Sequence, residues 1–398
     1  MQHADVANVF VCGGYVRDLI LGKPTQDIDL CVEGDSTTFS ETLANRLDLE
    51  KSFESEFMTF KLAAKEADAD VKSIDIVTCR DETYSAPASL PEVSPSSIEY
   101  DLTRRDFTVN AMAISLTSQS WGELIDPSNG FGDIMRKRIR VLHDSSFIDD
   151  PTRMFRAVRY ATRLDFGIDP HTIELITNAR EHVDLLSGTR VRNEFDHILK
   201  EPKICEILRN LEELGLLAAI TPALRVGPMA LKITGKLLQE SPEKSHLEDL
   251  LARVTFSLNE HEARLTSKRF DGPKSWSESI TGNAKLASVV EVLDNPSITP
   301  SEIADVLDTI PLQCIRAYIA TGSTLPRRGR LIDYLETIRF VEPDITGEDL
   351  IAIGVPEGPI IGQLLELVKR ARLDRKVSSR KDELELVRSQ LPEFLTHD

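Results

Sequence analysis

The sequence has few cysteines, and they form no pattern. Five are present, far apart and without a CxxC spacing: Cys12, Cys31, Cys79, Cys205 and Cys314. This distribution argues against a zinc site or a disulfide framework and is typical of a protein in a reducing cytosol. The sequence also lacks a basic amino-terminal region followed by an apolar core, and it lacks an apolar run of membrane-spanning length. We therefore expect a cytoplasmic protein with no membrane span.

Positive charge is in deficit, because 47 lysines and arginines face 65 aspartates and glutamates, which gives a net charge of −18. Phosphate binding depends on lysine and arginine with counterion release, so this balance by itself argues against a nucleic-acid partner. The positive side chains nevertheless cluster in four places: Arg136 to Arg140; Arg153, Arg156, Arg159 and Arg163; Arg327, Arg328 and Arg330; and Lys369 to Lys376. Such local tracks are compatible with a folded RNA, although solvated helix faces explain the last two clusters equally well.

Residues 1 to about 140 contain short runs in which apolar and polar residues alternate, as they do in β-strands. The runs are VFVCGG, DIDLCV, TFKLAA, SIDIVTC and TVNAMAIS. After residue 140 the sequence is rich in Leu, Glu, Arg and Ala, which favours helix. With 398 residues, 41% hydrophobic and 28% charged, the chain is long enough for several modules. The pattern predicts an α+β fold, with a mixed head followed by helical domains.

The stretch Val9–Val32, VFVCGGYVRDLILGKPTQDIDLCV, combines features of a phosphate site and a metal site. Its Gly13-Gly14 pair lies between an apolar run and a helical segment, where backbone amides can approach a phosphate closely. Asp27 and Asp29 lie two residues apart on an expected strand, so their carboxylates face the same side, and hard oxygen ligands suit Mg²⁺. Taken singly, each signal is also explained by a solvated strand edge or an ordinary turn.

A further acidic residue and an irregular segment follow later in the sequence. Asp75, in the run SIDIV, is either a third carboxylate of the same site or an ordinary polar strand residue. The segment Ser85–Ser97 contains three prolines and several serines and is expected to be irregular.

The segment Asp101–Asn110, DLTRRDFTVN, places adjacent Arg104 and Arg105 directly before an apolar run. A charge so close to a buried run must be paired or used. Arg105 would reach a triphosphate while Asp106 or Asn110 fixes its direction. Structural ion pairing explains the same residues equally well.

A helix is expected to begin near Asp149, because Asp149-Asp150-Pro151-Thr152 supplies acidic residues and a proline at its first turn. At the helical period, one side carries four arginines and the other is apolar: Arg153, Arg156, Arg159 and Arg163 face Met154, Phe155, Val158 and Ala161. An amphipathic helix with a solvated basic face explains this spacing.

Asp150 and Arg153 also allow a sharper hypothesis. A carboxylate only accepts hydrogen bonds and a guanidinium only donates them. On their Watson–Crick edges, cytosine and adenine each offer an exocyclic amine donor beside a ring-nitrogen acceptor, whereas uracil and guanine offer the reverse order. A mismatched base would leave buried donors and acceptors unpaired, at about 1–3 kcal/mol each. The two side chains therefore predict selection of C and A without a nucleic-acid template.

Four motifs, in order, resemble those of the family of bacterial class II CCA-adding enzymes, which are tRNA nucleotidyltransferases, and poly(A) polymerases, within the DNA polymerase β nucleotidyltransferase superfamily. They are Gly13 to Asp18 with Asp27 to Asp29, the DxxRRDFTxNA motif at Asp101 to Asn110, the EDxxR motif at Asp149 to Arg153, and Arg190 to Phe195. A run from Pro343 to Gly362 is similar to the tail of bacterial members. Asp149 departs from the pattern, since the family usually has Glu at this position.

The resemblance implies roles for individual residues. Asp27 and Asp29 would be the catalytic residues and would hold Mg²⁺. Asp150 and Arg153 would read the base. The other nucleotide-binding residues would be Gly14, Arg17, Arg105, Arg156 and Arg159.

The resemblance also implies an architecture. A polymerase-β-like nucleotidyltransferase head with an antiparallel or mixed sheet would occupy residues 1–140. A helical neck with the nucleotide-selecting helix would follow at 141–205, a helical body at 206–300 and a helical, tRNA-binding tail at 301–398. The implied reaction is a two-metal transfer of nucleotides from CTP and ATP to the 3′ end of tRNA, which would be bound at its acceptor end and elbow.

Full CCA addition is the first expectation. Members that add only A or only the two Cs share the motifs and are alternatives, as are a poly(A) polymerase and an inactive nucleotide- or RNA-binding member of the fold. The Arg-rich element that marks bacterial poly(A) polymerases has no counterpart in the stretch Phe53–Lys61, FESEFMTFK, so tRNA is the favoured substrate. The intact Asp27 and Asp29 argue against the inactive alternative.

Overall fold

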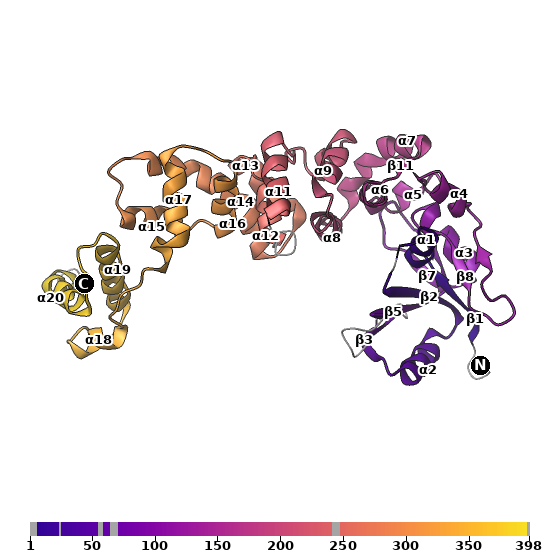
Figure 1. Ribbon diagram of the computed structural model, residues 1–398, viewed down its shortest axis with the longest axis horizontal. Coiled ribbons are helices and arrows are strands. Elements are labelled where there is room, and N and C mark those ends of the chain that lie inside the picture. Colours follow the sequence, from indigo (N-terminus) through magenta and orange to yellow (C-terminus); the bar gives the residue numbers. More distant parts are fainter. Residues whose placement is uncertain (1–5, 24, 55–58, 64–70, 241–246, 396–398) are drawn as a thin grey trace. The chain divides into compact units, whose positions relative to one another are not determined.

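The computed structural model describes residues 6–23, 25–54, 59–63, 71–240 and 247–395. The chain forms two compact units, Met1–Pro222 and Ala223–Asp398 (Figure 1). Within the described residues, every strand lies in the first unit, and the second unit is helical. This mixed head followed by helices confirms the predicted α+β class. No helix of the described residues has both the length and the apolar character needed to cross a bilayer.

The centre of the first unit is a seven-stranded sheet with the order β3-β4-β5-β2-β1-β8-β9. Its strands are β1 (Val6–Cys12), β2 (Asp27–Gly34), β3 (Glu50–Glu54), β4 (Thr59–Ala63), β5 (Ser73–Thr78), β8 (Ala113–Ser115) and β9 (Leu124–Ile125). The pair β2 and β5 is parallel and the other neighbours are antiparallel, so the sheet is mixed, as predicted. Two small sheets accompany it: antiparallel β6 (Arg80–Thr83) and β7 (Glu92–Pro95), and parallel β10 (Arg138–Ile139) and β11 (Gly167–Ile168).

Several helices of the first unit begin at side-chain caps, with Asp35, Asp169 and Ser187 as the N-caps. The helices of this unit are α1 (Gly14–Ile20), α2 (Ser36–Leu47), α3 (Ile98–Thr103), η1 (Thr108–Asn110), α4 (Gly130–Met135), α5 (Ser146–Asp149), α6 (Thr152–Leu164), α7 (Pro170–Ala179), η2 (Arg180–Leu185), α8 (Gly188–Leu199), α9 (Ile204–Glu213) and α10 (Leu216–Ile220). Ile98 and Leu102, one helical turn apart on α3, pack against Phe10, Cys31 and Ala113 of the sheet. This packing brings the segment that follows α3 against the end of β1.

The second unit has two apolar cores, one centred on α14 to α17 and one on α18 to α20. Its helices are α11 (Pro228–Glu240), α12 (Leu247–Val254), α13 (Glu260–Phe270), α14 (Lys274–Val289), η3 (Val290–Asp294), α15 (Pro300–Leu307), α16 (Leu312–Ala320), α17 (Pro326–Glu336), η4 (Ile338–Phe340), α18 (Gly347–Ala352), α19 (Pro359–Leu373) and α20 (Arg380–Leu395). Capping boxes begin α13, α15 and α18, with Asn259, Thr299 and Thr346 as the N-caps.

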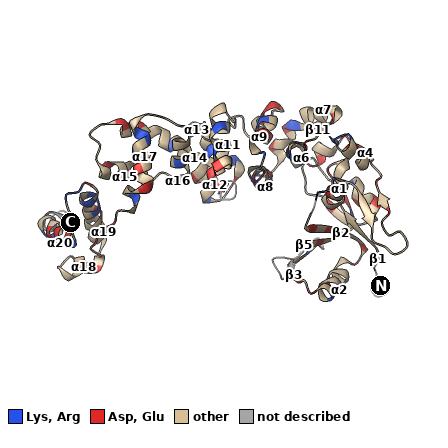
Figure 2. Ribbon diagram, viewed as in Figure 1, with Lys and Arg blue, Asp and Glu red and all other residues tan. Residues whose placement is uncertain are grey.

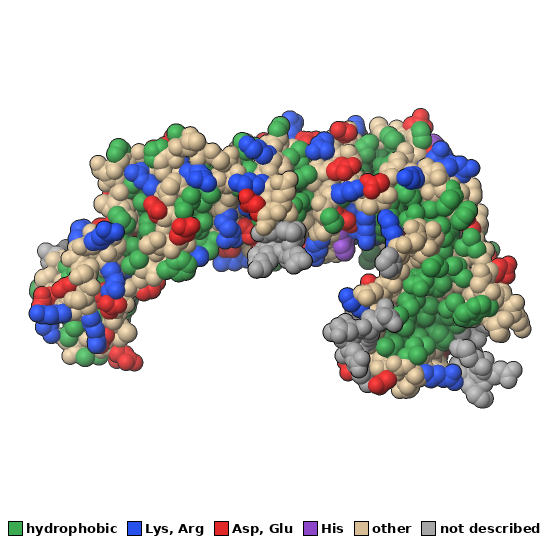
Figure 3. Space-filling model, in the orientation of Figure 1, with side chains coloured by type: hydrophobic (Ala, Val, Ile, Leu, Met, Phe, Trp, Pro, Cys, Tyr) green, Lys and Arg blue, Asp and Glu red, His purple; other side chains and the backbone are tan. Residues whose placement is uncertain are grey.

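Positively and negatively charged residues are interspersed along the helices of the second unit (Figure 2). Arg327 pairs with Asp294 and Arg370 with Asp305, while Arg372 contacts Asp344 at 2.6 Å. On the face seen in Figure 3, the head carries hydrophobic side chains over β1, β2 and β8, whereas the second unit mixes charges of both signs. The cluster Lys369 to Lys376 is thus largely engaged with acidic neighbours, whereas in the cluster at 327–330 Arg327 pairs with an acidic residue and Arg328 and Arg330 contact backbone oxygens.

Three local expectations need correction. The segment 85–97 is not irregular throughout, because β7 within it pairs with β6. In the run TVNAMAIS, Thr108–Asn110 is a 3₁₀ turn and only Ala113–Ser115 is a strand. The helix expected near Asp149 is divided, since α5 ends at Asp149 and α6 begins at Thr152 after Pro151. Part of the stretch 53–61, residues 55–58, lies outside the described residues.

Candidate active site

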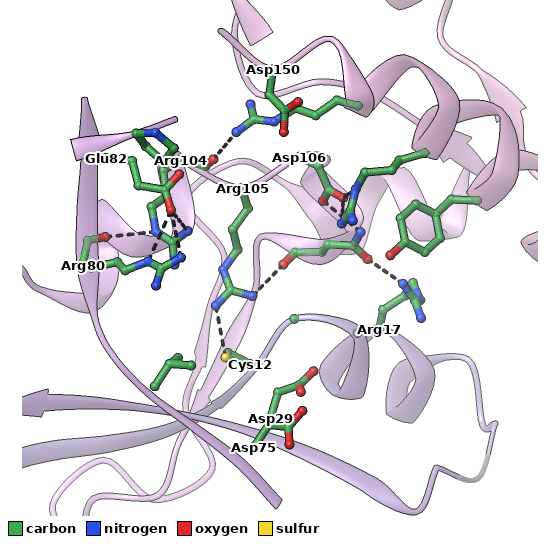
Figure 4. Close-up of a pocket in the computed structure, with 18 of the residues that line it drawn as sticks. Cys12, Arg17, Asp29, Asp75, Arg80, Glu82, Arg104, Arg105, Asp106 and Asp150 are labelled. Carbon is green, nitrogen blue, oxygen red and sulfur yellow. Dashed lines mark hydrogen bonds and ion pairs between the residues drawn. The ribbon is translucent and has the colours of Figure 1, made fainter. Parts of the chain in front are cut away.

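One cavity of about 660 Å³ in the first unit gathers most of the predicted site residues. Its walls come from the β1–α1 turn, β2, β5, the segment after α3, and helices α6 and α8. Figure 4 shows Asp29 and Asp75 together at one end, Asp150 at the other and Arg105 between them. Seven predicted residues line it: Gly14, Arg17, Asp29, Arg105, Asp150, Arg153 and Arg156. Asp27 and Arg159 are not among the lining residues.

The turn between β1 and α1 requires glycine at its first position. Gly13 has φ 71°, in the left-handed region, and a Cβ there would lie 2.7 Å from Arg105 Nη1. Gly14 begins α1, and a Cβ at Gly14 would lie 3.4 Å from Arg17 Nη2. The glycine pair therefore lets two arginines approach the turn closely.

Asp29 and Asp75 are direct neighbours in the parallel pair β2 and β5, and Asp27 is the neighbour of Ser73. Burial, followed by the negative charge of Asp75, raises the pKa of Asp29, and Asp27 adds to this effect. Asp27 is exposed, and its Oδ1 accepts a hydrogen bond from Ser73 Oγ at 2.6 Å. The charges of Asp75 and Asp27 thus both act on Asp29, and Asp29 and Asp75 line the cavity side by side.

These carboxylates fit a divalent cation. One Asp75 oxygen, Oδ1, is shielded from solvent and has no hydrogen-bond partner among the described residues, although Lys61 Nζ lies 3.3 Å away. A pair of neighbouring carboxylates, one of them with an oxygen that lacks a hydrogen-bond partner, is a hard ligand set of the kind that Mg²⁺ prefers. No group of three or more His, Cys, Asp or Glu side chains within the described ranges is closely enough arranged to complete a metal site by itself. Further ligands would have to come from a nucleotide or water.

The guanidinium group of Arg105 contacts Asp101 and two thiols. Its Nη2 donates to Asp101 Oδ2 at 2.8 Å and contacts the sulfurs of Cys12 and Cys31 at 3.1 and 3.2 Å. A hydrogen bond with Cys31, followed by burial, raises the pKa of the Cys12 thiol. The hydrogen bond with Cys12 would lower the pKa of the Cys31 thiol, but a hydrogen bond with Cys79 and burial outweigh it and raise that pKa, and the Arg105 charge acts against both rises. Asp101 therefore fixes the direction of Arg105 together with the backbone oxygen of Asn110, which accepts from Nη1 at 3.4 Å, and Nη1 also lies beside the Gly13 turn.

Asp106 and Asn110 instead connect Arg17 with Arg156. Arg17 Nη1 donates to Asn110 Oδ1 at 2.6 Å, and Asn110 Nδ2 donates to Asp106 Oδ1 at 3.0 Å. Asp106 Oδ2 then accepts from Arg156 Nε and Nη2 at 3.0 and 2.6 Å. Burial alone would raise the pKa of Asp106, but Arg156 outweighs it and holds the pKa below its ordinary value. Two arginines on different helices are thus locked relative to one another.

The proposed base-reading pair lies at the other end of the cavity. Arg153 is 5% exposed, and its two amino groups donate to Ser146 Oγ and to the backbone oxygen of Arg104, each at 2.8 Å. Asp150 Oδ1 accepts from Thr152 N at 2.9 Å and Thr152 Oγ1 at 2.6 Å. Both side chains are therefore fixed by neighbours while lining the cavity.

Helix α6 does not carry a solvated basic face, which corrects that interpretation. Arg153 and Arg159 are buried, and Arg159 contacts Glu201 at 3.5 Å and Glu194 at 3.9 Å. Burial raises the pKa of Glu194 although Arg156 and Arg159 lower it. Arg159 lines a second cavity of about 420 Å³, together with Lys200 and other residues of α8 and its end. Arg163 lines both cavities, so the two are neighbours.

Several lining residues were missed from the sequence. Tyr84 and Arg80 come from the β6–β7 region, Tyr160 from α6 and Arg190 from α8. Burial raises the pKa of Tyr84 to about 12, and its hydroxyl donates to Glu82 at 3.0 Å. The Tyr160 ring has three guanidinium groups 5.1–5.6 Å from its centroid. Only Arg190 carried a signal in the sequence, since it opens the fourth motif.

Two family models match the chain. The model described as "Poly A polymerase head domain" matches residues 9–140, and the model described as "Probable RNA and SrmB- binding site of polymerase A" matches residues 165–226. The first match contains the sheet, the glycine turn and the carboxylates, and the second contains α8 and α9.

Curated relatives match nearly the whole chain. The A-adding tRNA nucleotidyltransferase of Geobacter sulfurreducens is 33% identical over 95% of this chain and 44% of its own length. The A-adding enzyme of Halalkalibacterium halodurans is 29% identical over 98% of this chain and 89% of its own length. The CC-adding tRNA nucleotidyltransferase of Deinococcus radiodurans is 28% identical over 95% of this chain and 88% of its own length. The chain therefore spans less than half of the Geobacter relative.

Solved structures show the same architecture. A CCA-adding enzyme in an apo form superposes with a TM-score of 0.76 and 29% identity, over 96% of this chain and 92% of that one. The Thermotoga maritima CCA-adding enzyme complexed with tRNA gives a TM-score of 0.68 and 28% identity, over 96% of this chain and 91% of that one. With the four motifs in order, two matching family models and these likenesses, the chain belongs to the family of CCA-adding enzymes and poly(A) polymerases.

Proposed function

We propose that this chain is a tRNA nucleotidyltransferase that adds the terminal A to tRNA from ATP. One observation carries the proposal: a single cavity has a carboxylate pair at one end and the Asp150 and Arg153 pair at the other. Nucleotidyl transfer needs both a charged site for the triphosphate and a site for the base. Terminal A addition is common to enzymes named A-adding and CCA-adding, and relatives of both kinds match the chain.

In the proposed reaction, the 3′-hydroxyl of the RNA attacks the α-phosphate of the bound nucleotide, and pyrophosphate leaves. Asp29 would hold the divalent ion with a second carboxylate, Asp27 or Asp75, and with oxygens of the nucleotide or water, and Mg²⁺ is an ion that such an oxygen set suits. When bound, such ions acidify the attacking hydroxyl and neutralise the triphosphate. The Gly13 turn presents its backbone to the phosphates, and Arg17 and Arg105 supply positive charge beside it.

Addition of the two Cs is the second candidate, and the base-reading pair favours it, because Asp150 and Arg153 complement cytosine as well as adenine. The test is a matrix of purified tRNAs ending before CCA, at C or at CC, each given one labelled nucleotide. We expect incorporation of A into tRNA ending at CC. Incorporation of C into the two shorter tRNAs would add the second activity. If no tRNA is extended but unrelated RNA receives an A tail, the tRNA proposal is wrong.

Base selection gives a separate prediction. Arg153→Ala should weaken discrimination against UTP and GTP by about tenfold. In the wild type, uracil or guanine would leave the Arg153 donor without an acceptor, and the alanine variant no longer carries that cost. The measurement is kcat/KM for each of the four nucleotides. Arg209→Ala, which removes an exposed arginine of α9, is the control and should leave the ratios unchanged. Wild-type ratios in Arg153→Ala would exclude Arg153 from base reading.

A further inference from the structure

Arg190 bridges two segments of the cavity wall that are distant in sequence. Its Nη2 donates to Asp150 Oδ1 at 2.8 Å and its Nη1 donates to the backbone oxygen of Ala88 at 2.7 Å. The side chain is about a quarter exposed and lines the cavity. A guanidinium is planar and holds its donors at fixed angles, so a bridge of this kind sets the distance and orientation of its two partners.

The contact with Asp150 is specific to one oxygen. Three donors converge on Oδ1: Thr152 N, Thr152 Oγ1 and Arg190 Nη2, at 2.9, 2.6 and 2.8 Å. The lone pairs of Oδ1 are thereby occupied. No hydrogen bond reaches Oδ2 from the part of the chain that the structure describes. Oδ2 is therefore the oxygen that remains for the exocyclic amine of a base.

The contact with Ala88 fixes the opposite wall. Ala88 has φ 58°, which is unfavourable for a residue with a Cβ, and its N–H donates to the backbone oxygen of Ile148 at 3.0 Å. Its own carbonyl accepts from Arg190. Leu90 and Pro91, two and three residues further on, line the cavity. Arg190 therefore connects the wall before β7 to the carboxylate at the start of α6.

From this geometry we propose that Arg190 is a positioning residue for base selection: it orients Asp150 so that only Oδ2 faces the nucleotide, and it holds the Ala88 segment at a fixed distance from that oxygen. The proposal rests on the proposed function, in which Asp150 reads the base. Arg190 acts through Asp150 and does not itself need to touch the base.

The test compares nucleotide selectivity with stability in the full-length chain. Arg190→Ala should lower the preference for ATP over GTP about tenfold, in kcat/KM and in the dissociation constants of the two nucleotides measured by calorimetry. Arg190→Lys keeps the charge but cannot bridge both partners, so it should recover only part of the preference. Asn193→Ala, at an exposed position of α8, is the matched control and should keep the wild-type ratio.

A double-mutant cycle separates positioning from a general structural role. If Arg190 acts through Asp150, Arg190→Ala should not lower selectivity further in an Asp150→Asn background. Equal losses of kcat for all four nucleotides with an unchanged ratio, additive effects in the cycle, or full recovery by Arg190→Lys would each overturn the proposal. Calorimetric binding needs no RNA, so the result stands apart from the tRNA proposal: absence of tRNA extension by the wild-type protein would count against that function only.

Discussion

Asp29→Asn should abolish nucleotide incorporation while leaving the protein folded. Asp29 is the carboxylate on which burial and the charges of Asp75 and Asp27 act together, and it lines the cavity. Loss of a catalytic metal ligand removes several kcal/mol of transition-state stabilisation, so we expect a fall in rate of at least about 1,000-fold. The measurement is incorporation of labelled A into tRNA ending at CC.

The same variant should be at least as stable as the wild type, although it is inactive. The pKa of Asp29 is raised in the folded state, so its protonated form favours folding, and that contribution is lost as the pH rises through the folded-state pKa. At neutral pH the ionised carboxyl therefore opposes folding, and Asn removes this cost. We expect Asp29→Asn to melt at the same temperature as the wild type or higher when no divalent ion is present.

Adding MgCl₂ makes the metal assignment testable without activity. The wild-type melting temperature should rise with Mg²⁺, because an ion that binds only the folded state stabilises it. Asp29→Asn should lose most of this rise, and Glu41→Gln, an exposed position on α2, should keep it. Equal Mg²⁺ responses in Asp29→Asn and the wild type would exclude Asp29 as a ligand. Unchanged incorporation by Asp27→Ala would likewise exclude Asp27.

The sheet could be predicted from the sequence because alternation reports which strand face is buried. The local secondary-structure predictions that were wrong have physical explanations. Thr108, Val109 and Asn110 are all buried although they form a 3₁₀ turn, so the apolar character of that run reflected burial and not strand. The strand β7 was missed because prolines argue against strands, but Pro95 lies at its end, where a missing N–H does least harm.

The site could be predicted as far as its motifs extend. Asp29, Arg105, Asp150 and Arg153 lie around one cavity although they come from separate segments. The partners of these residues could not be derived, because spacing along the chain does not reveal contacts across it. The link from Asp106 to Arg156 joins residues 50 apart, and that from Arg190 to Ala88 joins residues 102 apart. Pattern reading therefore identified side chains that line the cavity better than the side chains that hold them.

Asp101 illustrates such a supporting residue and gives the largest expected effect on stability. Its carboxylate is fully buried and accepts from two guanidinium groups, Arg104 on Oδ1 at 2.5 Å and Arg105 on Oδ2 at 2.8 Å. Asp101→Asn would remove the negative charge and leave Arg105 without its carboxylate partner, while Arg104 would keep only Glu82 at 2.7 Å. Breaking a buried charge pair from one side costs about 3–5 kcal/mol, so the first unit should be strongly destabilised.

The pH dependence distinguishes lost charge from lost packing in Asp101→Asn. Burial alone would raise the pKa of Asp101, but Arg105 and Arg104 outweigh it and hold the pKa below its ordinary value. The stability from its ionised form is therefore present above the unfolded-state pKa and is lost as the pH falls through the lower folded-state pKa. Urea unfolding should show a wide gap between wild type and Asp101→Asn at neutral pH that narrows in acid. Glu99→Gln, exposed on the same helix, should change stability by less than about 0.5 kcal/mol. A gap that persists unchanged in acid would mean that the amide disturbs packing and that the two ion pairs contribute little.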